Sequence, residues 1–217
     1  MEVLTKKQFD LISTLAKEHW GLHITDQKFD LIKNRMIKHI RKSSYCNIDE
    51  YLQYFVQKSN DEEKLELFDV LSTNVTSFFR EMHHYNYLER ELYTPLMKKA
   101  ISKPGSRLRM WSAGCSIGCE PYSMGMHADV HLHGIKKWDI EILATDLSNS
   151  ALAVAQRAVY DQSCMQNSDT DTYMKYFSKQ DNLGQDKYMI DEKIRNIVHP
   201  ARLNLVDRWP FKGPFDI

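Results

Sequence analysis

The sequence predicts an α/β protein in which a small helical bundle precedes a domain built on a parallel β-sheet. Apolar residues recur at three- and four-residue spacing up to about residue 71, which is typical of helices. From residue 107 short apolar segments alternate with helical ones, and a Pro-Gly-Ser turn at 104–106 precedes that change. We therefore expect a helical domain over residues 1–72 and a sheet domain over residues 73–217.

Local signals place the helices of the first domain. Gly21 follows the first apolar segment and predicts a helix end, while Thr25-Asp26 predicts a cap for a helix that begins near residue 27. Asn47 precedes an acidic residue by three positions and predicts another start. We expect the last two helices of the bundle at 49–58 and 62–71, and a long helix at 81–101 after it.

In the second domain the pattern is strand, helix, strand, helix. Strands are expected at 107–113 and 140–145, with helices after Pro121 and Ser148, and this alternation predicts parallel strands with right-handed crossovers. Residues 161–195 are polar and less regular, which predicts a small inserted subdomain. A third strand is expected at 197–205, and residues 215–217 resemble the start of a fourth.

Composition narrows the class of protein. Lys plus Arg and Asp plus Glu each total 29, so no net field draws the chain to nucleic acid or to an anionic membrane. No segment has the ~18 apolar residues of a membrane span, and the first ten residues lack the apolar core of a signal peptide. We therefore expect a cytoplasmic protein, most simply a monomer.

The four cysteines are too few and too scattered to indicate a disulfide framework. Cys115, Cys119 and His127 could be considered as metal ligands, but no second Cys or His pair completes a set of four. We therefore predict no metal site.

A short loop after the first strand is the candidate ligand site. In parallel sheets, ligands bind beyond the carboxyl ends of the strands, where residues 113–118 (AGCSIG) and Asp146 fall. Glycines allow close backbone approach, and an aspartate there can accept hydrogen bonds from two ribose hydroxyls. The G-x-G-x-x-G spacing is missing, so S-adenosylmethionine fits better than a dinucleotide. The alternatives are a tight turn with a capping Asp146, and a Glu120 that only stabilises the start of the next helix.

Residues 73–81 (TNVTSFFRE) connect the two predicted domains. Phe78 and Phe79 can anchor this segment in a core while Arg80 and Glu81 point elsewhere. The alternative is an ordinary helix start in which Arg80 pairs with a surface acid.

Several of these motifs together resemble the CheR-type chemotaxis receptor methyltransferases. The matching segments occur in family order over nearly the whole chain: 73–81 (TNVTSFFRE), 111–123 (WSAGCSIGCEPYS), 144–148 (ATDLS), Asn204-Leu205 and 213–216 (GPFD). The resemblance implies a Rossmann-like class I S-adenosylmethionine-dependent methyltransferase domain after the helical bundle. Cys119 stands where the family usually has the first of two glutamates, and Glu120 keeps the second.

Carried over by position, the resemblance implies a set of cofactor-binding residues. Arg80 would lie near the methyl-transfer site and serve as the catalytic residue, Asp146 would hold the ribose, and Asn204 with Leu205 would flank the adenine. The full implied set is Asn74, Thr76, Arg80, Gly114, Glu120, Asp146, Asn204 and Leu205.

The reaction implied is transfer of a methyl group to receptor glutamates, which gives glutamyl methyl esters and S-adenosylhomocysteine. A carboxylate with a pKa near 4.3 is ionised at neutral pH and needs no general base, so catalysis would depend on alignment by a cation such as Arg80.

A basic face on the second helix is the candidate docking surface. Lys28, Arg35, Lys38 and Lys42 fall roughly on one side of it. In the resembling family the methylated receptor region is an acidic helical coiled coil, so this face is the expected contact. The alternatives are an ordinary solvated surface and nucleic-acid binding.

Two further expectations come from the resemblance. Some family members carry a small antiparallel subdomain at 161–195 that tethers a receptor peptide, but Gly184 stands alone here and the glycine-rich turn of those members is not evident. The family also continues beyond Gly213-Pro-Phe-Asp-Ile217 with further strands, so we expect an incomplete sheet domain. The alternative functions are a non-catalytic receptor-binding module, an inactive fragment, or a methyltransferase for small molecules or nucleic acid.

Overall fold

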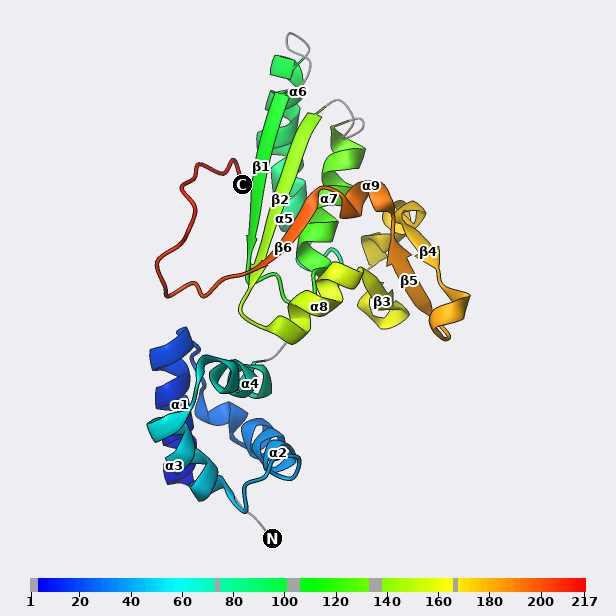
Figure 1. Cartoon of the computed structure of the whole chain (residues 1–217). Helices are drawn as coiled ribbons and strands as arrows, with labels where there is room; N and C mark the ends of the chain where they lie inside the picture. Colours follow the sequence, from blue (N-terminus) through cyan, green and yellow to red (C-terminus); the bar gives the residue numbers. More distant parts are fainter. Residues whose placement is uncertain (1–3, 73–74, 101–105, 133–137, 166–167) are drawn as a thin grey trace. The chain divides into compact units, whose positions relative to one another are not determined.

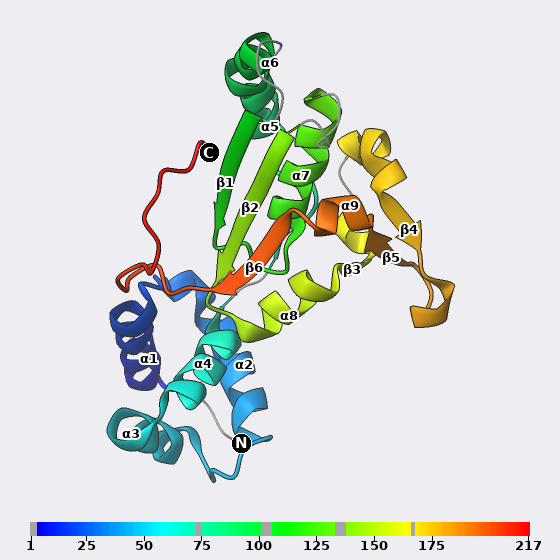
Figure 2. The same cartoon turned by 45° about the horizontal axis from the view of Figure 1, so that its top comes forward.

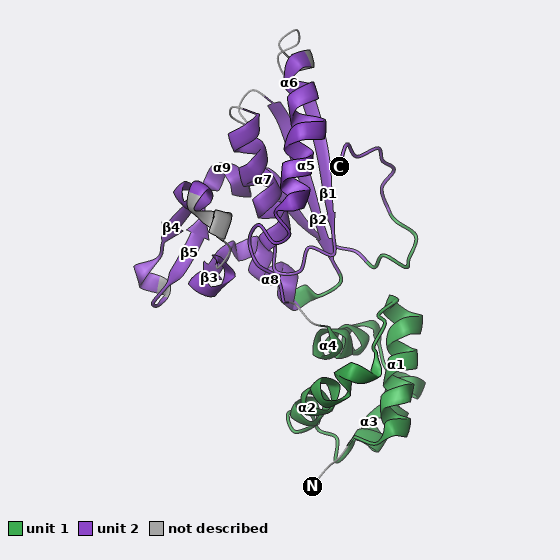
Figure 3. Cartoon of the chain, turned by 180° about the vertical axis from the view of Figure 1, so that it is seen from behind, with its two compact units in different colours: residues 1–73, 147–149, 204–209 green, residues 74–146, 150–203, 210–217 purple. Residues whose placement is uncertain are grey.

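The structure, a computed structural model, describes residues 4–72, 75–100, 106–132, 138–165 and 168–217 (Figure 1 and Figure 2). The chain divides into two compact units (Figure 3). Unit 1 comprises residues 1–73, 147–149 and 204–209, and unit 2 comprises residues 74–146, 150–203 and 210–217. No described helix is both long and apolar enough to cross a membrane.

The described part of unit 1 is a bundle of four helices. They are α1 (Lys6–Trp20), α2 (Phe29–Ile40), α3 (Ile48–Lys58) and α4 (Asp61–Leu71), with a short 3-10 turn at Asp26–Lys28. Their apolar stripes meet in one core that includes Phe9, Ile12, Ile32, Met36 and Leu67. The periodicity of the sequence thus predicts the bundle, because three- and four-residue spacing places these side chains on one face of each helix.

Two of the three local signals predicted to end or cap a helix in unit 1 are confirmed. Gly21 ends α1 in the left-handed conformation, with φ of 66° and its N–H directed to the carbonyls of Ala16 and Lys17. The side chain of Asn47 accepts the Glu50 N–H at 2.8 Å and caps α3. The predicted Thr25 cap is wrong: its side chain makes no cap hydrogen bond, and a 3-10 turn precedes α2.

A long helical segment follows residues 75–82 in unit 2, close to the range expected from the sequence. It consists of α5 (His83–Leu88), a π-helical turn η2 (Glu89–Tyr93) and α6 (Thr94–Ala100). The residues at both junctions, Glu89 and Thr94, keep right-handed helical dihedrals. The π turn therefore lies within a continuous helical run.

The main sheet of unit 2 has three parallel strands in the order β1-β2-β6. They are β1 (Ser106–Ala113), β2 (Trp138–Asp146) and β6 (Val198–Arg202), and α7 (Cys119–His131) follows β1 while α8 (Asn149–Arg157) follows β2. Alternate residues such as Leu108, Met110 and Ile142 are buried in the core of this unit. The helix α7 covers one face of the sheet (Figure 2). The predicted parallel arrangement is confirmed.

Residues between α8 and β6 form a second, antiparallel sheet. Its strands are β3 (Val159–Asp161), β4 (Phe177–Lys179) and β5 (Lys187–Ile190), in the order β3-β5-β4. Three 3-10 segments, Gln162–Met165, Ser168–Tyr176 and Asp181–Leu183, and the short helix α9 (Glu192–Arg195) complete this region. The polar 161–195 segment therefore contains short elements that the sequence pattern only partly indicated.

The last residues of the chain run beside β1 without forming a strand. Backbone hydrogen bonds join Asp216 N to Arg109 O at 2.7 Å and Trp111 N to Ile217 O at 3.0 Å. In place of the expected fourth strand at 215–217, these residues make two backbone hydrogen bonds with β1. The third strand is also shorter than expected, because β6 ends at Arg202 and not at residue 205.

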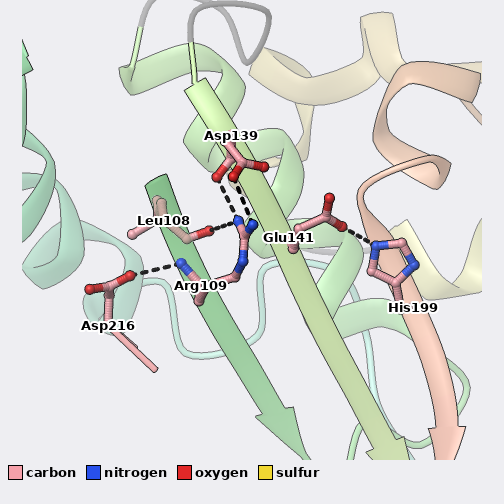
Figure 4. A network of polar contacts seen from close by, with 6 residues as sticks. All are labelled: Leu108, Arg109, Asp139, Glu141, His199 and Asp216. Atoms are coloured by element: carbon pink, nitrogen blue, oxygen red, sulfur yellow. Dashed lines mark hydrogen bonds and ion pairs between the residues drawn. The ribbon is translucent and has the colours of Figure 1, made fainter. Parts of the chain in front are cut away.

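The face of the main sheet that bears Arg109 carries a network of polar contacts (Figure 4). The Arg109 guanidinium pairs with the Asp139 carboxylate at 2.7 Å, and His199 contacts Glu141 across β2 and β6. The Asp216 carboxylate accepts the Arg109 N–H at 2.8 Å. These contacts join β1 to β2, β2 to β6, and β1 to the last residues of the chain.

Candidate functional site

The loop between β1 and α7 folds across the carboxyl end of β2. The N–H groups of Gly114 and Cys115 both donate to the Thr145 carbonyl, at 2.7 and 2.8 Å. Positive φ angles at Gly114 (84°), Ser116 (50°) and Gly118 (94°) produce the tight path of the loop. The loop thus lies at the edge of the sheet where parallel α/β folds bind ligands.

The two glycines of this loop have different surroundings. A Cβ atom added to Gly114 would have no heavy atom within 4 Å. At Gly118 it would lie 2.8 Å from the Tyr160 hydroxyl and 2.9 Å from the Ala155 Cβ. Gly118 is therefore needed for packing against the rest of unit 2, whereas the open space above Gly114 can accommodate a ligand.

Asp146 is held at the end of β2 by the same loop. Its Oδ2 accepts the Ser116 N–H at 2.7 Å, and its backbone carbonyl accepts the Leu203 N–H at 3.0 Å. The side chain is half-buried. A carboxylate fixed beside an open loop can accept hydrogen bonds from neighbouring hydroxyl groups of a ligand.

Glu120 is a second carboxylate at this edge. It is exposed at the start of α7, and its Oε1 accepts the hydroxyl of buried Ser112 at 2.6 Å. Burial, followed by the charges of Asp146 and Glu120, raises the pKa of the Cys115 thiol to about 12. The two carboxylates thus give the loop a negative field, which favours a cationic ligand.

The segment after residue 74 is anchored by its aromatic residues, as its composition predicted. Phe78 and Phe79 are fully buried, and the Phe79 ring stacks on Tyr173 with centroids 3.9 Å apart. The Phe79 N–H donates to the Ser123 Oγ at 3.0 Å, and this contact fixes the segment to α7.

Arg80 lies in a turn between two residues with strained backbones. Phe79 has φ of 52° and Glu81 has φ of 55°. The guanidinium is exposed, and its Nη1 donates to the Val75 carbonyl at 3.2 Å. Non-glycine residues in this conformation occur often at ligand sites. Thr76 is half-buried nearby in sequence, and Asn74 lies outside the described residues.

Asn204 and Leu205 belong to unit 1. The Asn204 amide donates to the His19 carbonyl at the end of α1, at 3.1 Å. Leu205 is 45% exposed, and its carbonyl accepts the Trp209 Nε1–H at 3.2 Å. The two residues that the resemblance implies as adenine contacts therefore pack with the helical bundle of unit 1.

Cys119 is buried at the start of α7 and does not join Glu120 at the loop surface. A hydrogen bond with the Cys164 thiol, and then burial, raise the pKa of Cys119. The same hydrogen bond lowers the pKa of Cys164 to about 7. The residue that replaces the usual glutamate is thus a packing residue.

The predicted basic face of α2 divides into two parts. Lys28, Lys38 and Lys42 are exposed. Arg35 is half-buried, and its Nη1 donates to the carbonyls of Val70 and Leu71 at 3.3 Å each and to that of Ser72. The guanidinium of Arg35 therefore caps backbone carbonyls at the carboxyl end of α4.

Sequence reasoning missed the serines that support the site. Ser112 orients Glu120, the Ser116 N–H holds Asp146, and Ser123 receives the Phe79 N–H. Ser112 stands two residues before Gly114 at the end of a strand, and this position could have indicated its role. The hydrogen bond of Ser123 depends on a segment 44 residues away in sequence.

Comparisons with known proteins match the chain over almost its whole length. The family model described as the CheR methyltransferase SAM binding domain matches residues 74–217, and the CheR methyltransferase all-alpha domain matches residues 7–72. A probable chemotaxis protein methyltransferase of Rhizobium etli is 32% identical over 91% of this chain and 73% of its own length.

Two further relatives are also named chemotaxis protein methyltransferases. A chemotaxis protein methyltransferase of Borreliella burgdorferi is 30% identical over 99% of this chain and 75% of its own length. The chemotaxis protein methyltransferase of Escherichia coli is 27% identical over 98% of this chain and 71% of its own length.

Proposed function

Because this chain belongs to the CheR family of chemotaxis methyltransferases, we propose that it methylates glutamate side chains of chemotaxis receptors in the cytoplasm. The family resemblance predicted from the ordered motifs is confirmed, and so is S-adenosylmethionine as the cofactor of the matched domain. The products would be glutamyl methyl esters and S-adenosylhomocysteine. The observation that best supports this activity is a fixed carboxylate, Asp146, beside the open space above Gly114.

The residues present fit this cofactor. S-adenosylmethionine, when bound, supplies a methyl group carried on a positively charged sulfur. Gly114 leaves room for close approach, Asp146 can accept ribose hydroxyls, and Glu120 adds to the negative field that the cation favours. By family resemblance, we assign Asn74, Thr76, Arg80, Asn204 and Leu205 as further cofactor contacts.

Arg80 is the proposed catalytic residue. A receptor glutamate is ionised at neutral pH, since its ordinary pKa is near 4.3, so no residue of the chain needs to remove a proton. An exposed guanidinium in a turn anchored by Phe78 and Phe79 can orient that carboxylate. Correct alignment in favourable intramolecular reactions supplies roughly 7–11 kcal/mol, which is an upper guide here.

The proposed receptor contact is the exposed part of the basic face of α2. Lys28, Lys38 and Lys42 can approach an acidic helical region of a receptor, and such complementarity mainly accelerates association and sets register. Arg35 belongs to the predicted face, but its guanidinium already binds the end of α4, so the proposal depends on the three lysines.

Calorimetric titration with S-adenosylhomocysteine tests the cofactor site. We expect the chain to bind this product and Asp146→Ala to lose most of the affinity. Asp181→Ala is the matched control, because it removes an exposed aspartate from the inserted region. If the folded chain does not bind, or if both variants bind like the parent, the proposed site is wrong.

A methylation assay tests both the proposed substrate and the proposed receptor contact on α2. Transfer of a labelled methyl group to receptor fragments in a base-labile form would identify glutamyl esters. A triple Lys28, Lys38 and Lys42 to Gln variant should methylate more slowly and lose salt dependence. The control replaces Lys7, Lys17 and Lys58, which are also exposed in unit 1. Equal slowing in both triple variants would contradict the dock.

A further inference from the structure

Three side chains with metal-ligand chemistry converge away from the cofactor loop. His127 and His131 are four residues apart in α7 and therefore lie on one face of that helix. Glu89, the first residue of the π turn η2, faces them. One ligand atom from each of the three residues lies within 4.8 Å of the others.

A surface ion pair accounts for only part of this cluster. The His131 Nδ1 lies 3.2 Å from the Glu89 Oε1, which an ordinary pair would explain. The His127 ring stacks on His131 with centroids 4.1 Å apart, yet it takes no part in that pair. The ion pair therefore does not explain why a second imidazole, that of His127, lies beside it.

His127 is fully buried, and neither of its ring nitrogens has a hydrogen-bond partner in the described structure. Its neighbours include the rings of Tyr85 and Tyr93, with centroids 5.4 and 5.6 Å away. Buried polar side-chain atoms are normally paired, and a neutral imidazole has one donor and one acceptor to satisfy. A metal ion bound to one nitrogen would satisfy the acceptor.

We propose that Glu89, His127 and His131 bind one divalent transition-metal ion of the Zn²⁺ class. Two imidazoles and a carboxylate suit Zn²⁺ and its neighbours in the first row, and three protein ligands leave a position for water. The side chains of His131 and Glu89 are 23% and 47% exposed, so an ion can enter from solvent. π turns occur frequently at functional sites, which agrees with the position of Glu89.

This site differs from the grouping that the sequence suggested. The sequence places two cysteines near His127, Cys115 and Cys119, but it offers no fourth ligand for that group and predicts no metal site. In the structure His127 instead faces Glu89, whose approach depends on the packing of η2 against α7. The bound ion would tie η2 to α7, the helix that begins directly after the cofactor loop.

Metal titration of the full chain tests the proposal without any measurement of activity. The chelator-treated protein is titrated with Zn²⁺ by calorimetry and with Co²⁺ by visible absorption, and thermal melting is followed with and without Zn²⁺. We expect one ion per chain, Co²⁺ bands typical of a low-symmetry nitrogen and oxygen site, and a higher melting temperature with Zn²⁺.

Variants at the rim of the site keep the test independent of folding. His131→Gln and Glu89→Gln change partly exposed side chains, so both should fold, as circular dichroism can verify. Mutation of a residue that only hydrogen-bonds to a metal ligand weakens metal affinity roughly 10-fold to 100-fold. Each rim variant removes a ligand itself, so its affinity for Zn²⁺ should fall at least about tenfold.

The control is His84→Gln, which removes an exposed imidazole from the surface cluster Glu81, His83 and His84. It should bind Zn²⁺ like the parent chain. Absence of binding by the folded parent, unchanged binding in both rim variants, or loss of binding in His84→Gln instead would each overturn the proposal.

Discussion

The hydroxyl of Ser112, buried at the end of β1, donates a 2.6 Å hydrogen bond to Oε1 of exposed Glu120 at the start of α7. This bond fixes the direction of one of the two carboxylates beside the open loop. The bond links the end of strand β1 to the first turn of helix α7, across the loop that we propose binds the cofactor.

Ser112→Ala should therefore weaken cofactor binding without unfolding the protein. Loss of one hydrogen bond costs about 1 kcal/mol, so the affinity for S-adenosylhomocysteine should fall about fivefold in calorimetry. Ser178→Ala, an exposed serine of β4, is the control and should leave the affinity unchanged. Unchanged binding in Ser112→Ala would show that Glu120 does not depend on this contact.

Gly114 and Gly118 should give opposite results when each is replaced by alanine. Both have positive φ, so each variant carries backbone strain of about 1–2 kcal/mol. At Gly118 the new methyl group also meets the Tyr160 hydroxyl and Ala155, so thermal melting should fall much further. At Gly114 the methyl group enters open space, so the main loss should be in cofactor affinity.

Melting and calorimetric titration of the two variants form one experiment. If Gly114→Ala binds S-adenosylhomocysteine like the parent, the space above Gly114 is not the cofactor site. If Gly118→Ala melts no lower than Gly114→Ala, the packing role of Gly118 is wrong.

The elements that the sequence predicts well are those with local causes. The alternation of buried residues in β1 and β2 and the left-handed Gly21 depend only on neighbours in the chain. The ends of those strands place the loop and Asp146 together, because parallel strands terminate at one edge of the sheet. This part of the candidate site follows from pattern alone.

The remaining contacts depend on residues far apart in sequence. Arg35 has the spacing of an exposed basic face, and only the end of α4 beside it explains why its guanidinium turns inward. The approach of Glu89 to His131 requires the π turn, which breaks the usual helical spacing. Thr25 is a residue type that often caps helices, but its side chain makes no cap hydrogen bond here. The next residue, Asp26, pairs at 2.5 Å with Lys6, which lies 20 positions earlier in the chain.

Arg35→Met should destabilise unit 1, although the residue lies on a helix rich in exposed lysines. The methionine keeps much of the apolar stem but leaves the carbonyls of Val70 and Leu71 without their donor. Buried acceptors left unpaired cost about 1–3 kcal/mol, which urea unfolding can measure. Lys38→Met, on the exposed side of α2, should stay within about 0.5 kcal/mol of the parent. Equal stability of the two variants would contradict a capping role for Arg35.

His39 should make the stability of unit 1 sensitive to mild acid. Its ring is half-buried and packs edge-on against Tyr51, with centroids 5.1 Å apart. Burial lowers the pKa of His39 below its ordinary value of 6.5, and the charge of Glu66 opposes this shift only in part. The unfolded chain therefore binds a proton at a higher pH than the folded protein does.

The sign of the effect follows from that difference. The contribution of neutral His39 to the free energy of unfolding is fully present above pH 6.5 and declines as the pH falls from there toward the lower pKa of the folded state. Urea unfolding of unit 1 between neutral and mildly acidic pH should therefore show a shallower decline for His39→Gln than for the parent. Lys38→Gln changes the same helix without removing the imidazole, so it should retain the parent slope. Parallel pH curves for the parent and His39→Gln would show that the buried imidazole does not contribute to the acid sensitivity of the bundle.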